Sequence, residues 1–403
     1  MEVFVARLPI FDRSKEVCAH ELVFREGFDS YYRALGADHS AVDLEAMVSF
    51  EELTDGLRGL VPFTRELLLS EFSSLLSPQT VMIGIPPDIG PDDEVVATCK
   101  RLKQAGFTIS MDHRNLTLWK ALVLELVDLF RIDFQAGTHQ QRQQLCTQLE
   151  DSGIHTLAQH VDSLATFDQA VEMGFTYFQG DFIEKPTINE DQEIPANQLN
   201  QMRVLHEINR PELSYDEIAE VIKRDVSMTY QLLQLINSVA FGLRYEVSSI
   251  RHALVLLGPA EIRKWGAMLA VRGLAIEKPP EILVRSLTRA RACEQVAVAV
   301  GMQKDAPELF LVGMLSLIDV LTEKPIEMAL DMLPLSQAIR TTLLGGASPY
   351  RLLFETVLAY ESGDWSTFSL HAAELQLNEA AMPDLFHSSQ KWAGEAMKAP
   401  VGQ

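Results

Sequence analysis

The nine residues VCAHELVFR, Val17 to Arg25, alternate between two kinds of side chain, which is the pattern of a half-buried strand. Because successive side chains of a strand point to opposite faces, Glu21 and Arg25 share one face. The same face also carries the small apolar residues Val17, Ala19 and Val23. A carboxylate in this position either helps to hold a metal at the mouth of a site or is a solvated or salt-bridged side chain without chemistry.

Short β-like segments alternate with helical patterns as far as residue 185. Besides 17–25, the strand candidates are 2–7, 80–85, 107–112, 129–133, 155–160 and 176–181, and the helical segments are 42–57, 65–76, 92–104, 116–126, 140–149 and 164–173. Ala105-Gly106 and Met173-Gly174 end two helices directly before strands, where a left-handed glycine is favoured. This alternation predicts parallel strands and a closed (β/α)8-like barrel. Because about 190 residues is small for such a barrel, we expect it to be trimmed.

The chain changes character after residue 185. The stretch KPTINEDQEIPANQLN, Lys185 to Asn200, is polar, acidic and proline-bearing. We therefore expect a barrel at 1–185, a linker at 186–200 and a second domain at 201–403. The apolar period of the second domain is helical, which predicts an all-α fold. Helix starts are expected at Ser214 and at Ser248 or Ser249, and helix stops at Gly242 and at Gly258-Pro259.

The composition excludes several classes of protein. With 403 residues, 47% hydrophobic and 22% charged, the chain is globular and long enough for two or three domains. A net charge of −22 disfavours nucleic acid as a partner. No apolar run approaches the length of about 18 residues that a membrane span needs, and no signal peptide is apparent. Four scattered cysteines predict buried free thiols, so we expect a cytoplasmic protein without membrane or nucleic-acid partners.

The candidates for chemistry are polar residues where barrel strands are expected to end. Glycine loops for phosphates, HExxH and the serine-hydrolase elbow are not found, and no cofactor is predicted. Sites of (β/α) barrels form at the carboxyl ends of strands. The polar residues at these ends are Asp112, His113, Asp133, His160 and Asp162. The alternative is that these side chains cap helices and satisfy loop backbones.

Two sets of motifs resemble known domains. The stretch VARLPIFDRSKEVCAHELVFR, residues 5–25, is similar to the opening of EAL-type domains, and YFQGDFIEKP, residues 177–186, to their closing strand. The stretch LLQLINSVAFGLRYEVSSIRHALVLLGPAEIRKW, residues 232–265, is similar to the core of HDOD domains, which are helical relatives of HD phosphohydrolases without the metal signature. Together they have the order of bacterial EAL–HDOD two-domain signalling proteins.

The resemblance implies a site whose ligands can be compared one by one. Active EAL enzymes hydrolyse cyclic diguanylate with a divalent-metal pair held by carboxylates and an asparagine, and with a lysine near the attacking water. Glu21 stands at the signature glutamate and Arg25 at the arginine that follows it. Asp112 stands at the first of two paired aspartates, but His113 stands at the second.

The remaining positions depart further from the family pattern. Arg131 stands at the lysine, with Asp133 still present, and Gln179 is retained. Gln159 and Asp162 stand in place of two glutamates. Pro62 stands where the asparagine is expected, and Gly84 stands at a second ligand position.

These replacements predict that the barrel binds no metal. Hard divalent cations need several oxygen ligands, and proline and glycine side chains supply none. Without the paired ions the site cannot generate hydroxide or neutralise phosphate charge. An arginine stays charged and cannot handle a proton as lysine does. The sequence therefore predicts that the chain is not an enzyme.

Three functions remain open. The interpretation that the sequence favours is a non-catalytic signalling or scaffold protein that acts through protein–protein contacts, with the helical domain as output module. The second is a cyclic-dinucleotide receptor that binds without cutting, with Arg25, Arg131 and Gln179 against the ligand. The third is an active metal-dependent phosphodiesterase. The partners considered are an unidentified protein, weakly bound cyclic diguanylate and a second copy of the chain.

Overall fold

The chain forms two compact units. The computed structural model describes residues 4–26, 50–51, 53–70, 72–73, 76–119, 122–186, 195–224, 226–236, 247 and 249–398. One unit comprises Met1–Lys185 with Ala359–Ser366, and the other comprises Pro186–Leu358 with Thr367–Gln403. The predicted linker extends into a helix, because residues 196–200 already belong to α9 (Ala196–Asn209).

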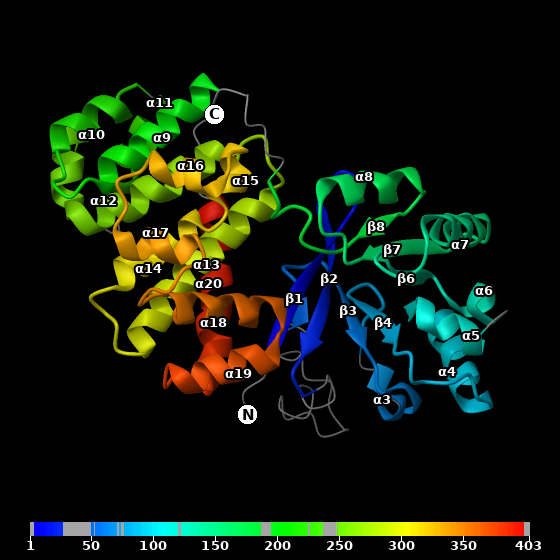
Figure 1. Ribbon diagram of the computed structural model, residues 1–403. Helices are drawn as coiled ribbons and strands as arrows, with labels where there is room; N and C mark the ends of the chain where they lie inside the picture. Colours follow the sequence, from blue (N-terminus) through cyan, green and yellow to red (C-terminus); the bar gives the residue numbers. More distant parts are fainter. Residues whose placement is uncertain are drawn as a thin grey trace. The chain divides into compact units, whose positions relative to one another are not determined.

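The first unit is built on a closed barrel of eight strands in the order β1 to β8 (Figure 1). The strands are β1 (Val5–Phe11), β2 (Val17–Phe24), β3 (Arg58–Pro62), β4 (Val81–Ile85), β5 (Thr108–Asp112), β6 (Leu129–Asp133), β7 (His155–Gln159) and β8 (Tyr177–Phe178). Neighbours from β2 to β8 pair in parallel, whereas β1 is antiparallel to both β2 and β8. The predicted barrel is confirmed, and its irregular part is the β1–β2 hairpin, which has no helix between its strands.

Strand β3 is not predicted by the sequence. Its five residues, RGLVP, begin with an arginine and contain a glycine and a proline, so no alternation is visible in it. Register reveals the strand instead, because Leu60 pairs with Glu21 on one side and with Met82 on the other. The predicted helix at 42–57 lies mostly outside the described residues.

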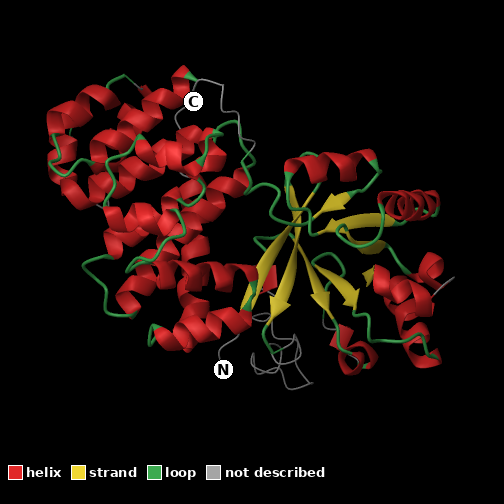
Figure 2. Ribbon diagram, viewed as in Figure 1, coloured by secondary structure: helices red, strands yellow, loops and turns green. Residues whose placement is uncertain are grey.

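Helices cover the outside of the barrel, as Figure 2 shows for the described residues. They are α3 (Arg65–Leu69), α4 (Asp93–Gln104), the 3-10 turn η2 (His113–Asn115), α5 (Leu116–Trp119), α6 (Leu122–Leu126), α7 (His139–Asp151) and α8 (Leu164–Glu172). Gly106 and Gly174 have φ of +91° and +95°, which confirms the two predicted left-handed glycines.

The interior of the barrel is filled in layers. Ile10, Ala19, Leu60, Met82, Leu129 and Leu157 form one buried apolar layer. Side chains of a strand alternate, so the residue two positions further on points the same way. On this rule Glu21 follows Ala19, Arg131 follows Leu129 and Gln159 follows Leu157. The polar layer above the apolar core therefore lies at the mouth where the parallel strands end, which we call the C-terminal mouth.

The second unit is helical throughout its described residues. Besides α9, its helices are α10 (Tyr215–Ile222), α11 (Val226–Ile236), α12 (Ile250–Leu274), α13 (Pro280–Ala299), α14 (Ala306–Leu315), α15 (Ile318–Thr322), α16 (Ile326–Asp331), α17 (Gln337–Leu343), α18 (Arg351–Ser362), α19 (Trp365–Glu374), the 3-10 turn η4 (Glu379–Ala381) and α20 (Met382–Lys398). Parts of α18 and α19 belong to the first unit by the division above.

The helix ends of this unit follow the sequence signals in part. Ser214 and Ser249 cap α10 and α12 by accepting from the backbone N–H of Glu217 and of His252, as predicted. The predicted stop at Gly258-Pro259 is confirmed, because Gly258 takes a non-helical φ of +77° and ψ of 166°, and α12 consists of two helical segments that meet at this kink. The other predicted positions, Ser248 and Gly242, lie outside the described residues. Among the described helices, none has the length and apolar character that crossing a bilayer requires.

Candidate functional site

Glu21 sits at the C-terminal mouth with both carboxylate oxygens hydrogen-bonded. Arg131 Nη1 donates to Oε1 over 3.1 Å, and Gln179 Nε2 donates to Oε2 over 2.9 Å. The side chains of Glu21 and Arg131 are only 14% and 9% exposed. Gln159 Nε2 donates to Gln179 Oε1 over 3.1 Å and extends the network to β7. Of the two alternatives for Glu21, the salt-bridged side chain is the one that this geometry matches.

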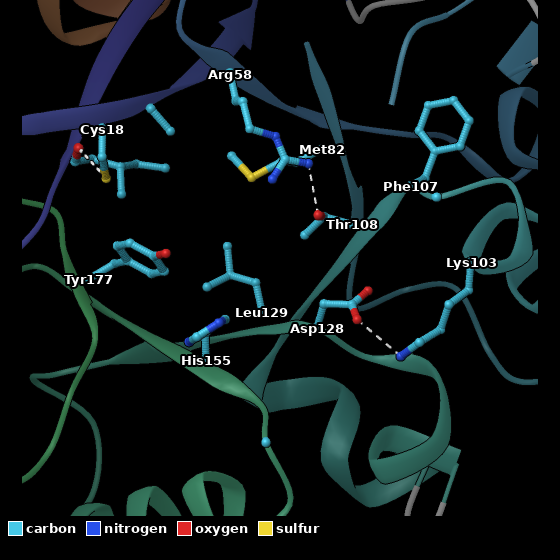
Figure 3. A pocket seen from close by; sticks show the side chains of 14 residues that line it. Cys18, Arg58, Met82, Lys103, Phe107, Thr108, Asp128, Leu129, His155 and Tyr177 are labelled. Atoms are coloured by element: carbon cyan, nitrogen blue, oxygen red, sulfur yellow. Dashed lines mark hydrogen bonds and ion pairs between the residues drawn. The ribbon is translucent and has the colours of Figure 1, made fainter. Parts of the chain in front are cut away.

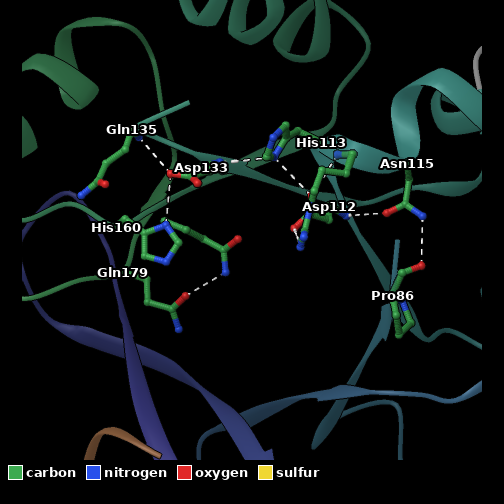
Figure 4. Close-up of polar contacts among 10 residues, drawn as sticks. Pro86, Asp112, His113, Asn115, Asp133, Gln135, His160 and Gln179 are labelled. Atoms are coloured by element: carbon green, nitrogen blue, oxygen red, sulfur yellow. Dashed lines mark hydrogen bonds and ion pairs between the residues drawn. The ribbon is translucent and has the colours of Figure 1, made fainter. Parts of the chain in front are cut away.

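Asp112 ends β5 and caps the turn η2 that follows (Figure 4). Arg114 donates to it twice from its guanidinium, Nε to Oδ1 over 2.8 Å and Nη2 to Oδ2 over 3.0 Å, and once from its backbone N–H. Asn115 Oδ1 accepts from the Asp112 N–H, and its Nδ2 donates to the carbonyl of Pro86. Burial acts to raise the pKa of Asp112, but the Arg114 hydrogen bonds outweigh it and hold that pKa below its usual value.

Asp133 ends β6 and faces His160. His160 Nδ1 lies 3.1 Å from Asp133 Oδ1, and the backbone N–H of Gln135 donates to the same oxygen over 2.9 Å. Burial acts to raise the pKa of Asp133, but these hydrogen bonds hold it below its usual value. His113 Nδ1 lies 3.2 Å from Asp112 Oδ1 and 3.5 Å from the Asp133 N–H. The first contact needs a proton on Nδ1 and the second needs a lone pair, so His113 can serve only one of them at a time.

The remaining predicted residues lie at different distances from this network. Asp162 accepts a hydrogen bond from Gln135 Nε2. Pro62 and Gly84 are register partners on β3 and β4, and neither of these two residues has a side-chain oxygen or nitrogen to offer a ligand. Arg25 is placed elsewhere: its guanidinium carbon lies 4.9 Å from the centroid of the Phe4 ring, in a cation–π contact.

Sequence reasoning missed Arg114 and Asn115. Arg114 is 64% exposed and supplies the bidentate partner of Asp112. The signal for Asn115 is the spacing D-x-x-N in DHRN, which is a capping box with both reciprocal hydrogen bonds present. The sequence gives less indication of the role of Arg114, because its guanidinium reaches back to the carboxylate of Asp112, two residues earlier, and no sequence pattern predicts that contact.

The residues at the mouth do not fit the metal pair that the EAL resemblance implies. Within the described ranges no group of three histidine, cysteine, aspartate or glutamate side chains is placed to hold a metal ion. Glu21 is engaged by Arg131 and Gln179, and Asp112 by Arg114. A divalent cation would have to displace these donors before it gained an oxygen ligand. The arrangement offers instead a ring of amides, imidazoles and a guanidinium.

Comparison with known proteins identifies a domain in the second unit and relatives that align with nearly the whole chain. The HDOD domain model matches residues 194–322. The chain is 31% identical over 412 residues to the uncharacterized protein YuxH of Bacillus subtilis, covering 99% of this chain and 100% of YuxH. It is 26% identical over 398 residues to the cyclic di-GMP phosphodiesterase CdgJ of Vibrio cholerae, covering 97% of this chain and 92% of CdgJ.

Solved structures also resemble the chain over a smaller part. The EAL domain of Mycobacterium smegmatis DcpA is 16% identical, with a TM-score of 0.34, over 44% of this chain and 90% of that one. The manganese and cyclic di-GMP complex of Klebsiella pneumoniae BlrP1 is 18% identical, with a TM-score of 0.36, over 45% of this chain and 55% of that one.

The prediction that the chain is not an enzyme is contradicted by this comparison. CdgJ is named a cyclic di-GMP phosphodiesterase, and its similarity extends through nearly the whole of both chains. The prediction treated each lost metal ligand as a loss of the reaction. A relative that is named as an enzyme and aligns over 92% of its own length overturns that inference.

Proposed function

Because the chain belongs to the family of two-domain proteins in which an EAL-type barrel precedes an HDOD domain, we propose that it is a cyclic di-GMP phosphodiesterase. The observation that carries the proposal is the similarity to CdgJ over 97% of the chain. The reaction adds water across one phosphodiester bond of the ring and releases the linear dinucleotide.

The C-terminal mouth supports this proposal as the place where the ligand binds. Cyclic di-GMP carries two phosphates, and phosphates are held best by charge-assisted hydrogen bonds from guanidinium and imidazole groups. Arg114 and His160 are each 64% exposed at the mouth, so a ligand can reach them. Gln159, which is only partly buried, adds an amide that suits the edge of a guanine base. No step through a metal is part of this proposal.

Hydrolysis is the direct test. The full-length chain is incubated with cyclic di-GMP alone, with Mg²⁺ and with Mn²⁺, and the products are separated by ion-pair chromatography. We expect the linear dinucleotide to accumulate in proportion to enzyme concentration. The proposal fails if no condition yields product above a heat-inactivated control.

A matched pair of variants ties the activity to the mouth. Arg114→Gln removes an exposed guanidinium that faces the ligand, whereas Arg101→Gln removes one on the outer face of α4. We expect Arg114→Gln to raise KM about tenfold, because a lost charge-assisted phosphate contact costs about 1.5–3 kcal/mol. Arg101→Gln should leave KM unchanged. Equal behaviour of the two variants would place the site elsewhere.

A further inference from the structure

The barrel has a cavity at its other mouth, where the parallel strands begin. It has a volume of about 520 Å³, and the first residues of five strands line it: Arg58, Thr108, Leu129, His155 and Tyr177 (Figure 3). Asp112, Asp133 and Gln159 lie at the last positions of their strands, so the two sites are at opposite ends of the barrel. We call this cavity the N-terminal-mouth pocket.

Arg58 carries a charge in this pocket without a counter-ion. Its Nη2 donates to Thr108 Oγ1 over 2.7 Å and to the carbonyl of Pro78 over 3.3 Å, and both acceptors are neutral. Its Nε is buried and has no hydrogen-bond partner. Among the residues that line the pocket, the only carboxylate is Asp128, which is already taken by Lys103 Nζ at 3.0 Å and by the backbone N–H of Ile109 at 3.0 Å.

An unpaired guanidinium in a half-buried cavity is costly in the absence of an anion. Burial lowers the pKa of Arg58, which reflects the penalty on its charged form. Arginine stays charged nonetheless, because its pKa begins so high. An oxyanion in the pocket can accept a charge-assisted hydrogen bond from Nη1, because both protons of Nη2 are already donated to Thr108 and Pro78 and Nε is buried.

The rest of the pocket is suited to an apolar body. Ala19, Met82 and Leu129 at its inner end are at most 6% exposed, and they belong to the apolar layer of the barrel. The rings of Tyr177 and His155 meet edge to face, with centroids 5.8 Å apart, along one side. A cavity of about 520 Å³ lies in the range of small-molecule sites, about 300–1,000 Å³.

We propose that the N-terminal-mouth pocket binds a small organic oxyanion, with the charged group on Arg58 and a compact apolar body against the inner layer. The ligand chemistry is a carboxylate or a phosphate monoester on a single ring. This site is separate from the cyclic di-GMP site, and neither proposal depends on the other.

The test titrates the full chain with three ring compounds, benzoate, phenyl phosphate and uncharged benzamide, by calorimetry and by saturation-transfer NMR. We expect at least one of the anions to bind saturably and benzamide to bind at least tenfold more weakly. The relative affinities of benzoate and phenyl phosphate show whether the pocket prefers a carboxylate or a phosphate monoester. If neither anion saturates, or benzamide binds as well as both, the proposal is overturned.

Three variants locate the binding. Arg58→Gln should weaken the anion at least tenfold, and Arg101→Gln, which removes an exposed guanidinium on the outer face of α4, should have no effect. If Arg58→Gln does not fold, Arg58→Lys decides, because an ammonium keeps the charge but cannot hold the hydrogen bonds to Thr108, to Pro78 and to the anion in one plane, and it should weaken benzoate at least threefold. Wild-type affinity in the folded Arg58 variant, or a loss in Arg101→Gln instead, would assign the anion to another site.

Discussion

Glu21 and Arg131 neutralise each other in a setting that water hardly reaches. Removing one partner of such a pair leaves the other as a buried, uncompensated charge. Their separation of 110 positions along the chain explains why the sequence did not identify Arg131 as the partner of Glu21. Alternation within one strand identifies neighbours on that strand, but the partner across a barrel depends on strand order and register. The network of Gln159 and Gln179 escaped prediction for the same reason.

We expect Glu21→Gln to lower the free energy of unfolding by about 3 kcal/mol, because Arg131 then stays buried without its counter-ion. Urea denaturation followed by circular dichroism measures this loss. The double variant Glu21→Gln with Arg131→Met should recover at least half of it, because it removes the stranded charge. A double variant as unstable as the single one would show that packing, and not charge, gives Glu21 its role.

The ionisation of Asp112 makes the stability of the fold depend on pH in the acid range. Its pKa in the folded chain lies below the ordinary value of 3.8, so the unfolded chain binds a proton more readily in this range. The stabilisation from Asp112 is therefore present above about pH 4 and is lost as pH falls through the folded pKa. Asp112→Asn should be less stable than wild type at pH 7, and the difference should shrink below pH 4 in thermal melts. A difference that stays constant down to pH 2 would contradict this origin.

Asp319, at the start of α15, should behave in the opposite way. Burial raises its pKa above the usual 3.8, and Glu327 adds to that rise. The folded chain then holds the proton more tightly, so the carboxylate form costs stability as pH rises above 3.8. We expect Asp319→Asn to have a higher melting temperature than wild type at pH 7 and the same one near pH 3. A lower melting temperature at pH 7 would mean that the charge favours the start of α15 more than burial penalises it.

At the scale of elements, the strands and helices with regular periods were predictable and the irregular ones were not. The helix α4, predicted at 92–104, is found at Asp93–Gln104, because its apolar positions and its Asp92 cap agree. Strand β3 was missed because its RGLVP sequence has the residues of a turn. The helix end predicted at Gly258-Pro259 is present as a non-helical Gly258, but a glycine–proline pair does not tell whether a second helical segment starts directly beyond it.

The approach of α14 to α13 depends on one glycine. A Cβ on Gly313 would lie 2.4 Å from the backbone of Arg289 and Ala290, which is far inside van der Waals contact. We expect Gly313→Ala to destabilise the helical unit by about 3 kcal/mol, because backbone atoms cannot yield as a side-chain end can. Thermal unfolding of the full chain measures the loss of stability. Amide hydrogen exchange, analysed on peptides from the HDOD region, shows whether the loss lies in the helical unit.

The matched control is Gly394→Ala in α20, where a Cβ would meet nothing within 4 Å. An alanine there should stabilise the helix by about 0.4–1 kcal/mol, because glycine is the poorer helix former. If both substitutions had the same effect, the close contact between α13 and α14 would not be what limits the size of residue 313.

At the scale of the molecule, the chain divides into two compact units, so a ligand that binds one unit need not stabilise the other against unfolding. We expect cyclic di-GMP at a hundred times its Kd to stabilise the barrel by about 2.7 kcal/mol. Amide hydrogen exchange should show slower exchange in β2, β5, β6 and β7 and no change in α13. Equal slowing in both units would mean that they unfold as one.

The barrel closes through its first and last strands, which meet at a single register pair, Phe11 with Phe178. A chain that leaves the ribosome from its amino end therefore makes β1 long before the strand that completes the ring. Until residue 178 emerges, one side of β1 has no partner and the apolar interior stays open on that side. Closure is thus the last event in building the barrel itself, and a pause in translation before the codon for Phe178 would prolong the stage at which the nascent barrel is most prone to aggregate.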